Sequence, residues 1–213
     1  MILLDAVRWI GTHPTEFLAA LQQHLLMSAI SLAIGLLIAL PLAVLILPSR
    51  VGAGLTVGLV NAIRTIPSLA ILAAALPILG IGIVPSIVAL VVLAVPPILI
   101  NSLIGLREVD ADLIDAASGM GMRRAQILWR VRLPLAAPAI FAGIRTAAVQ
   151  IISGATLASF IGGGGLGDFI TAGIALMDYS RLLVGAVPIA LLAIGVELGM
   201  ASLERRLFVA KSA

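Results

Sequence analysis

The chain alternates between long apolar runs and short polar segments. Each of five apolar runs is long enough for a helix that crosses a bilayer, which needs roughly 20 residues. These runs lie at about residues 25–47, 55–76, 84–104, 135–160 and 182–203. Hydrophobic residues make up 62% of the chain and charged residues only 11%, whereas soluble domains carry about 25% charged residues. The pattern predicts an all-α integral membrane protein with about five transmembrane helices.

The basic residues predict the orientation of these helices. An odd number of spans places the two termini on opposite sides of the membrane. If the N-terminus lies outside, the outer segments hold only Arg8 and Arg181. The inner segments then hold Arg50, Arg107, Arg123, Arg124, Arg130, Arg132, Arg205, Arg206 and Lys211. Because inner loops of membrane proteins are enriched in Lys and Arg, we expect the N-terminus outside and the C-terminus in the cytoplasm.

Three regions are expected along the chain. Charged residues interrupt residues 1–23, so this stretch does not resemble a cleavable signal, and Trp9 and Phe17 are expected at headgroup depth. The first span is expected to start near His24. We therefore predict an extracytoplasmic or interfacial segment at 1–19, a transmembrane domain at 20–204 and a cytoplasmic tail at 205–213.

The polar stretch DAASGMGMRRAQILWRVRLP, residues 115–134, lies between the third and fourth apolar runs. Its charges cannot reside in hydrocarbon, so it must face water. Asp110 or Asp112 can cap a short helix, and Gly121 offers the left-handed turn that ends it. A second helix is expected from about Arg123, with Leu133 and Pro134 stopping it before the next span. This hairpin has small and thioether side chains around its apex, which suit a partner's groove.

The same stretch resembles a motif of ABC importer permeases. That motif reads E-A-A, three residues, G, nine residues, I, one residue, L-P. Here it stands as Asp115, Ala116, Ala117, Gly121, Val131, Leu133 and Pro134, with Asp for Glu and Val for Ile. The stretches 61–72, 96–106, 143–150 and 158–174 resemble the osmoprotectant permeases of the glycine betaine, carnitine and choline group. The resemblance covers about residues 20–204.

The resemblance implies a type I ABC importer permease in a bacterial cytoplasmic membrane. Residues 105–134 would form a cytoplasmic coupling loop, whose short helix docks on a separate ATPase through Asp115, Ala116, Ala117, Met120, Gly121 and Met122. Val131, Leu133 and Pro134 would support the loop. The chain would bind no cofactor, because the ATPase uses the ATP. A second permease, expected to be an identical copy but with a related chain as the alternative, and an extracytoplasmic binding protein would complete the importer.

Three charged residues lie about two turns from the inner ends of their predicted spans: Arg64, Arg145 and Glu197. A charge at that depth needs a partner, water or the interface. Arg145 and Glu197 could form an inner gate that rearranges during transport. Alternatively, all three residues snorkel to the interface and any ion pair is static.

Polar residues within the spans are candidates for the transport pathway, because such groups generally face protein or water and not lipid. They are Asn61, Asn101, Gln150, Ser153 and Thr156. Ordinary hydrogen bonds between helices are an equally good interpretation. Aromatic residues make up only 4% of the chain, although quaternary amines are typically held in aromatic cages. Specific capture is therefore expected in the binding protein.

Other classes of function fit less well. Residues 162–167 match G-x-G-x-x-G formally, but the expected βαβ context is missing. The scattered basic residues do not form a nucleic-acid patch. An ion-coupled transporter would be expected to show inverted repeats, and an intramembrane hydrolase would need a motif such as G-x-S-x-G; neither is present in the sequence. A methionine-type importer shares the pattern of residues 61–67, whereas residues 168–188 favour the osmoprotectant group.

Overall fold

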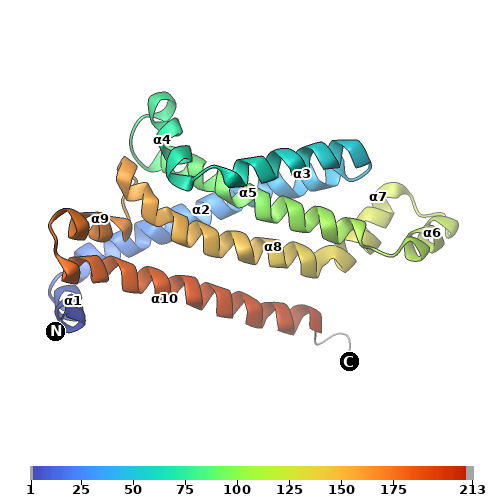
Figure 1. Ribbon diagram of the computed structural model, residues 1–213. Helices are drawn as coiled ribbons and strands as arrows, with labels where there is room; N and C mark the ends of the chain where they lie inside the picture. Colours follow the sequence, from blue (N-terminus) through green and yellow to red (C-terminus); the bar gives the residue numbers. More distant parts are fainter. Residues whose placement is uncertain (1, 210–213) are drawn as a thin grey trace.

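The computed structural model describes residues 2–209, which contain helices and no strand. The predicted all-helical fold is thus confirmed. The longest helices run side by side along one axis, with the polar hairpin, residues 108–132, at one end and α1 and α9 at the other (Figure 1). The elements are α1 (Ile2–Thr12), α2 (Pro14–Ile46), α3 (Arg50–Thr65), α4 (Ser68–Leu79), α5 (Ile83–Arg107), α6 (Ala111–Gly119), α7 (Arg124–Ile127), π-helical η1 (Leu128–Arg132), α8 (Leu133–Gly154), 3-10-helical η2 (Ala155–Ile161), α9 (Gly167–Ala175), α10 (Tyr179–Glu204) and π-helical η3 (Arg205–Val209).

Four helical segments within residues 2–209 are long and apolar enough to cross a membrane, and a fifth span results if the bent pair α3–α4 counts as one. The segments are α2, α5, the continuous rod Arg124–Ile161 and Tyr179–Phe208. The chain is therefore an all-helical membrane protein with four or five candidate spans. Residues 210–213 of the predicted tail, including Lys211, lie outside the described residues.

The predicted second span, residues 55–76, is not one straight helix. α3 and α4 meet at an angle of 94°. The break falls at Ile66 and Pro67, where Ile66 has an extended backbone with φ −73° and ψ 127°. The Pro67 ring disfavours a helical conformation in the residue before it, so α3 ends there and a new helix starts at Ser68. Hydropathy alone does not register this break, because both arms are apolar.

The N-terminal region also differs from the prediction. α2 begins at Pro14, about ten residues before the predicted start of the first span, since proline is well suited to the first turn of a helix. Trp9 and Phe17 pack on Phe169 of α9, with ring centroids 5.1 Å and 6.5 Å apart respectively. Trp9 and Phe17 are half-buried in this contact, and their expected place at headgroup depth stays a prediction.

α5 lies at the centre of the bundle, in contact with α2 and α8. Small residues let the helices approach closely. A Cβ atom added at Gly143 of α8 would lie 2.8 Å from the carbonyl oxygen of Pro97, and one at Gly105 of α5 would lie 2.6 Å from Cβ of Ala139. The backbones of α5 and α8 therefore pack too tightly for larger side chains at these two positions.

The glycine run at 162–167 is a turn between two helical segments. Gly162, Gly164 and Gly165 have φ values of 71°, 75° and 85°, which favour glycine because it carries no Cβ. The Gln23 side chain of α2 donates to the Gly163 carbonyl at 2.9 Å. η2 precedes the turn and α9 follows it, so the strand–turn–helix context of a dinucleotide site does not occur here.

Candidate functional site

The polar hairpin, residues 108–132, begins with a well-capped helix. The Asp110 carboxylate accepts a hydrogen bond from the Asp112 backbone N–H at 2.9 Å, which satisfies one free donor at the start of α6. α6 ends at a turn in which Gly121 has a φ of 79°. The Met122 N–H donates to the Ala117 carbonyl at 3.2 Å and closes the turn. The predicted cap at Asp110 and left-handed turn at Gly121 are both confirmed.

The apex of the hairpin is open to a partner. Met120 is 77% exposed, and Asp115, Ala116 and Gly121 are exposed as well. Ala117, by contrast, is only 2% exposed, so within this chain it packs the inside of the hairpin. Three of the remaining predicted residues are half-buried, namely Met122, Val131 and Leu133. Pro134 is exposed. The predicted docking residues thus divide into an exposed surface and a buried support.

The second arm of the hairpin does not stop at Leu133 and Pro134, contrary to the prediction. α7, η1 and α8 form one continuous helical rod. The Leu133 N–H donates to the Leu128 carbonyl, one residue further back than in an α-helix. In an α-helix the Pro134 ring would clash with the Arg130 carbonyl; the wider π turn relieves this clash and lets the helix continue. The hairpin is therefore joined directly to α8.

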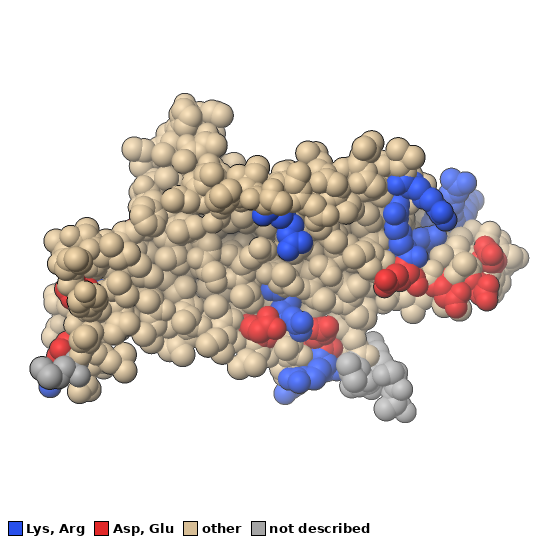
Figure 2. All heavy atoms as spheres, viewed as in Figure 1, with Lys and Arg blue, Asp and Glu red and all other residues tan. Residues whose placement is uncertain are grey.

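Two arginines fix the base of the hairpin to the bundle. Arg132 Nη1 donates to the Leu106 carbonyl of α5 at 3.0 Å. Arg107 Nη2 donates to the Ser49 carbonyl, between α2 and α3, at 3.1 Å. The Leu106 carbonyl lies in the last turn of α5, where carbonyl groups lack partners within the helix. The Ser49 carbonyl precedes α3 and also accepts a hydrogen bond from the Ala53 N–H at 3.0 Å. The hairpin thus has a firm base and an exposed apex, and charged side chains gather at this end of the molecule (Figure 2).

A second charged cluster joins α8 and α10. Arg145 Nε lies 3.5 Å from Glu197 Oε1, as the predicted ion pair requires. Arg145 Nη1 also donates to Glu204 Oε2 at 2.6 Å. Glu204 was not predicted, although it follows Glu197 by seven residues, which is two helical turns on the same face. Arg64 is exposed on α3 and takes part in none of the ion pairs found among residues 2–209.

The predicted pathway residues fall into two groups. Asn61, Gln150 and Ser153 are exposed, the last two on neighbouring turns of α8. Asn101 and Thr156 are half-buried, and Asn101 Nδ2 donates to the Pro97 carbonyl of its own helix at 2.8 Å. The exposed group is free to meet water or another chain, whereas Asn101 is at least partly engaged within α5.

Buried polar contacts at the other end of the bundle were also missed. His24 is fully buried, and its Nε2 lies 3.1 Å from the Ile152 carbonyl of α8. Its partner is 128 residues away, so no local pattern reveals it. Among residues 2–209, no three His, Cys, Asp or Glu residues are grouped as they would be to hold a metal ion.

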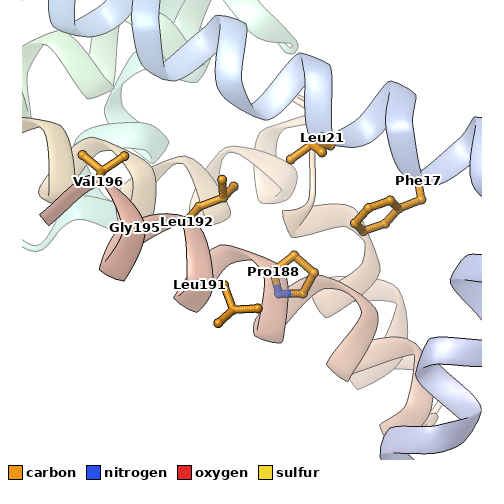
Figure 3. A pocket seen from close by; sticks show the side chains of 7 residues that line it. All are labelled: Phe17, Leu21, Pro188, Leu191, Leu192, Gly195 and Val196. Atoms are coloured by element: carbon orange, nitrogen blue, oxygen red, sulfur yellow. The ribbon is translucent and has the colours of Figure 1, made fainter. Parts of the chain in front are cut away.

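A shallow groove of about 470 Å³ lies between α2 and α10, where the side chains of the two helices face each other (Figure 3). Its lining is apolar: Phe17, Leu21, Pro188, Leu191, Leu192, Gly195 and Val196. The lining has no carboxylate to pair with a cation. Phe17 is its one aromatic ring, and a single ring does not make a cage. The groove is therefore poorly suited to a quaternary amine.

Comparison with known proteins gives four related findings. A family model described as "Binding-protein-dependent transport system inner membrane component" matches residues 26–209. The choline transport system permease protein OpuBB of Bacillus subtilis (strain 168) is 46% identical, over 94% of this chain and 93% of that protein. The glycine betaine/carnitine/choline transport system permease protein OpuCB of the same organism is 43% identical, over 93% and 91%. A solved structure of the inward-facing MetNI methionine ABC transporter aligns with a TM-score of 0.79 at 25% identity, over 91% of this chain and 98% of that one.

We predict that the ion pair of Arg145 with Glu204 contributes more to the stability of the fold than the pair of Arg145 with Glu197. The Glu204 contact is shorter, and the Glu204 side chain is 24% exposed against 47% for Glu197. Double-mutant cycles of Arg145→Ala with Glu204→Gln and with Glu197→Gln, measured by thermal unfolding in detergent, should give a coupling energy of about 1 kcal/mol for Glu204. The coupling to Glu197 should be smaller, on the order of 0.3 kcal/mol.

The exposed pair of Arg8 with Asp5 provides the control, since Arg8→Ala should leave the unfolding temperature unchanged. Additive losses for Arg145 and Glu204 would show that their contact contributes nothing to stability.

Proposed function

We propose a function for this chain from the premise that it belongs to the family of binding-protein-dependent transport system inner membrane components, whose model matches most of its length. The chain is a multi-pass permease subunit of an ABC importer in the bacterial inner membrane, and it is not itself catalytic. Such permeases work with an ATPase and a binding protein, and the ATPase uses the ATP. The substrate, the docking residues and the orientation are our proposals.

The polar hairpin docks on the ATPase in this proposal. Asp115, Ala116, Met120 and Gly121 present a small, exposed apex, where short side chains allow close approach of a partner's groove. Met120 adapts its shape to that groove. Ala117 supports the apex from inside. Closure of two ATPase subunits would draw the hairpin along, and the continuous rod from Arg124 to Ile161 would carry the movement into the bundle.

The substrate in this proposal is a quaternary amine osmoprotectant, such as choline, glycine betaine or carnitine. The observation that carries it is the identity to permeases named for these compounds, which extends over nearly the whole chain. A methionine importer is the alternative raised by the solved structure, which is less similar in sequence. Phe169 is only 3% exposed and packs against Trp9 and Phe17, so it is occupied within the fold. Substrate selection is accordingly assigned to the binding protein.

The pathway in this proposal lies between this chain and a second permease. Asn61, Gln150 and Ser153 are polar and exposed on helices that are otherwise apolar, and polar groups in spans generally avoid lipid. A second chain facing them would enclose a polar path. An identical copy and a related permease both meet this requirement. The ion pairs of Arg145 with Glu197 and Glu204 hold α8 to α10 while the helices move.

The proposed orientation places the polar hairpin in the cytoplasm and the turn between α9 and α10 outside. The chain has no cysteine, so one introduced cysteine reports one position. Met120 and Met177 are matched probes, since they are 77% and 76% exposed. In cells without the ATPase, an impermeant maleimide should label a Met177→Cys variant from outside, and a Met120→Cys variant only in inside-out vesicles. The reverse pattern would contradict this orientation.

Transport by the reconstituted importer tests the substrate and the hairpin together. Proteoliposomes with the cognate ATPase and binding protein should accumulate choline, glycine betaine or carnitine when ATP is supplied, and should not accumulate methionine.

Ala116→Arg should lower the uptake rate at least about tenfold, because a bulky charge at the apex would oppose docking. Arg145→Glu combined with Glu204→Arg should recover part of the uptake lost in either single variant.

Val51→Arg is the control for added charge, since Val51 is exposed at the start of α3 and lies outside the hairpin. It should transport at nearly the normal rate. Accumulation of methionine alone would overturn the substrate class, and normal uptake by Ala116→Arg would overturn the docking role of the apex.

A further inference from the structure

A second groove, of about 670 Å³, lies between the end of α2 and the polar hairpin. This volume falls within the range of small-molecule sites, roughly 300–1,000 Å³. One part of its lining is apolar and comes from α2 and the hairpin: Val44, Leu47, Ile114, Ile127 and Leu128. Another part is charged, with Asp115, Arg124 and Arg132. Its lining thus combines apolar and charged side chains, whereas the groove between α2 and α10 is lined by apolar residues.

The position of this groove fits the boundary between hydrocarbon and headgroups. Val44 and Leu47 lie at the end of α2, a candidate membrane span, and Leu45 beside them is exposed. Trp129, on the π turn next to Leu128, is exposed as well. Tryptophan is enriched at this boundary, where one part of the ring meets hydrocarbon and another meets polar groups. The occupant of the groove is therefore expected to be amphipathic.

The charges in the groove favour a phosphate. Arg124 forms no ion pair with any carboxylate of residues 2–209. Arg132 uses Nη1 for the Leu106 carbonyl, which leaves other guanidinium N–H groups available. Two guanidinium groups against one carboxylate, Asp115, leave an excess of positive charge in the lining. Guanidinium groups match the geometry of phosphate oxygens and can donate two hydrogen bonds at once.

We propose that this groove binds one diacyl phospholipid from the leaflet at the hairpin end. Its phosphate meets Arg124 and Arg132, and an acyl chain lies along Val44 and Leu47. A lipid in this place braces the hairpin against α2. The inference goes beyond the proposed function, because binding of the lipid requires neither transport nor the ATPase. A protein side chain from the ATPase is the competing occupant, since Asp115 also belongs to the apex.

Lipid binding to the purified full-length chain tests this inference. Native mass spectrometry in detergent would compare dioleoylphosphatidylglycerol and dioleoylphosphatidylethanolamine with dioleoylglycerol, which lacks the phosphate, and with glycerol phosphate, which lacks the chains. Both phospholipids should bind, and the two partial molecules should neither bind nor compete. Arg124→Gln should weaken phospholipid binding about tenfold, the size expected for the loss of one charge-assisted hydrogen bond. Arg124→Lys should retain part of the affinity.

Arg123→Gln is the matched control, because Arg123 is the exposed neighbour with the same charge but does not line the groove. It should bind phospholipid normally. Equal loss in both variants would show a general attraction to basic residues and would overturn the site. Equal binding of dioleoylglycerol, or full competition by glycerol phosphate, would also overturn it. So would a photoactivatable phospholipid that labels Leu47 no more than Leu191, or that is fully displaced when the ATPase binds.

Discussion

The structure depends on how one charged segment is held at the end of an apolar bundle. The polar hairpin cannot enter hydrocarbon, so it must project into water, yet a loose loop would transmit no force. Arg132 and Arg107 resolve this conflict by donating to carbonyl groups at helix ends. Close packing at Gly105 holds α5 against α8 just below the hairpin. The apex is thereby exposed while its base is fixed.

The continuous rod from Arg124 to Ile161 connects the hairpin mechanically to the bundle. Because the π turn carries the helix past Pro134, a displacement of the hairpin moves α8 as well. α8 contacts α2, α5 and α10, and Arg145 links it to two carboxylates of α10. A permease of this kind needs such stiffness, because its energy comes from a separate ATPase and must reach a path formed by other helices. The groove beside α2 adds a place where the surrounding membrane could stiffen the same hairpin.

Local features of the chain were predictable, and features that depend on distant partners were not. Asp110 and Gly121 act within a few residues of themselves, so cap and turn follow from residue type. The apolar runs identify α5 and α10, because the length and hydropathy of a helix are also local properties of the chain. Hydropathy could not show the bend at Pro67, since both arms are apolar, although the proline itself was a signal. Pro134 wrongly predicted the end of a helix, because a π turn accommodates a proline that the interior of an α-helix excludes. The contact of His24 with Ile152 has no local signal, whereas the spacing of Glu197 and Glu204 would have identified the second carboxylate.

Photochemical crosslinking from the apex tests whether the polar hairpin contacts the ATPase during transport. A benzophenone attached to a Met120→Cys variant, in proteoliposomes that actively accumulate substrate, should crosslink to the ATPase subunit. The same group at Met177, equally exposed but at the other end of the bundle, should not. Crosslinks from Met120 that never include the ATPase, or that match those from Met177, would contradict the role of the hairpin as the link between ATP hydrolysis and transport.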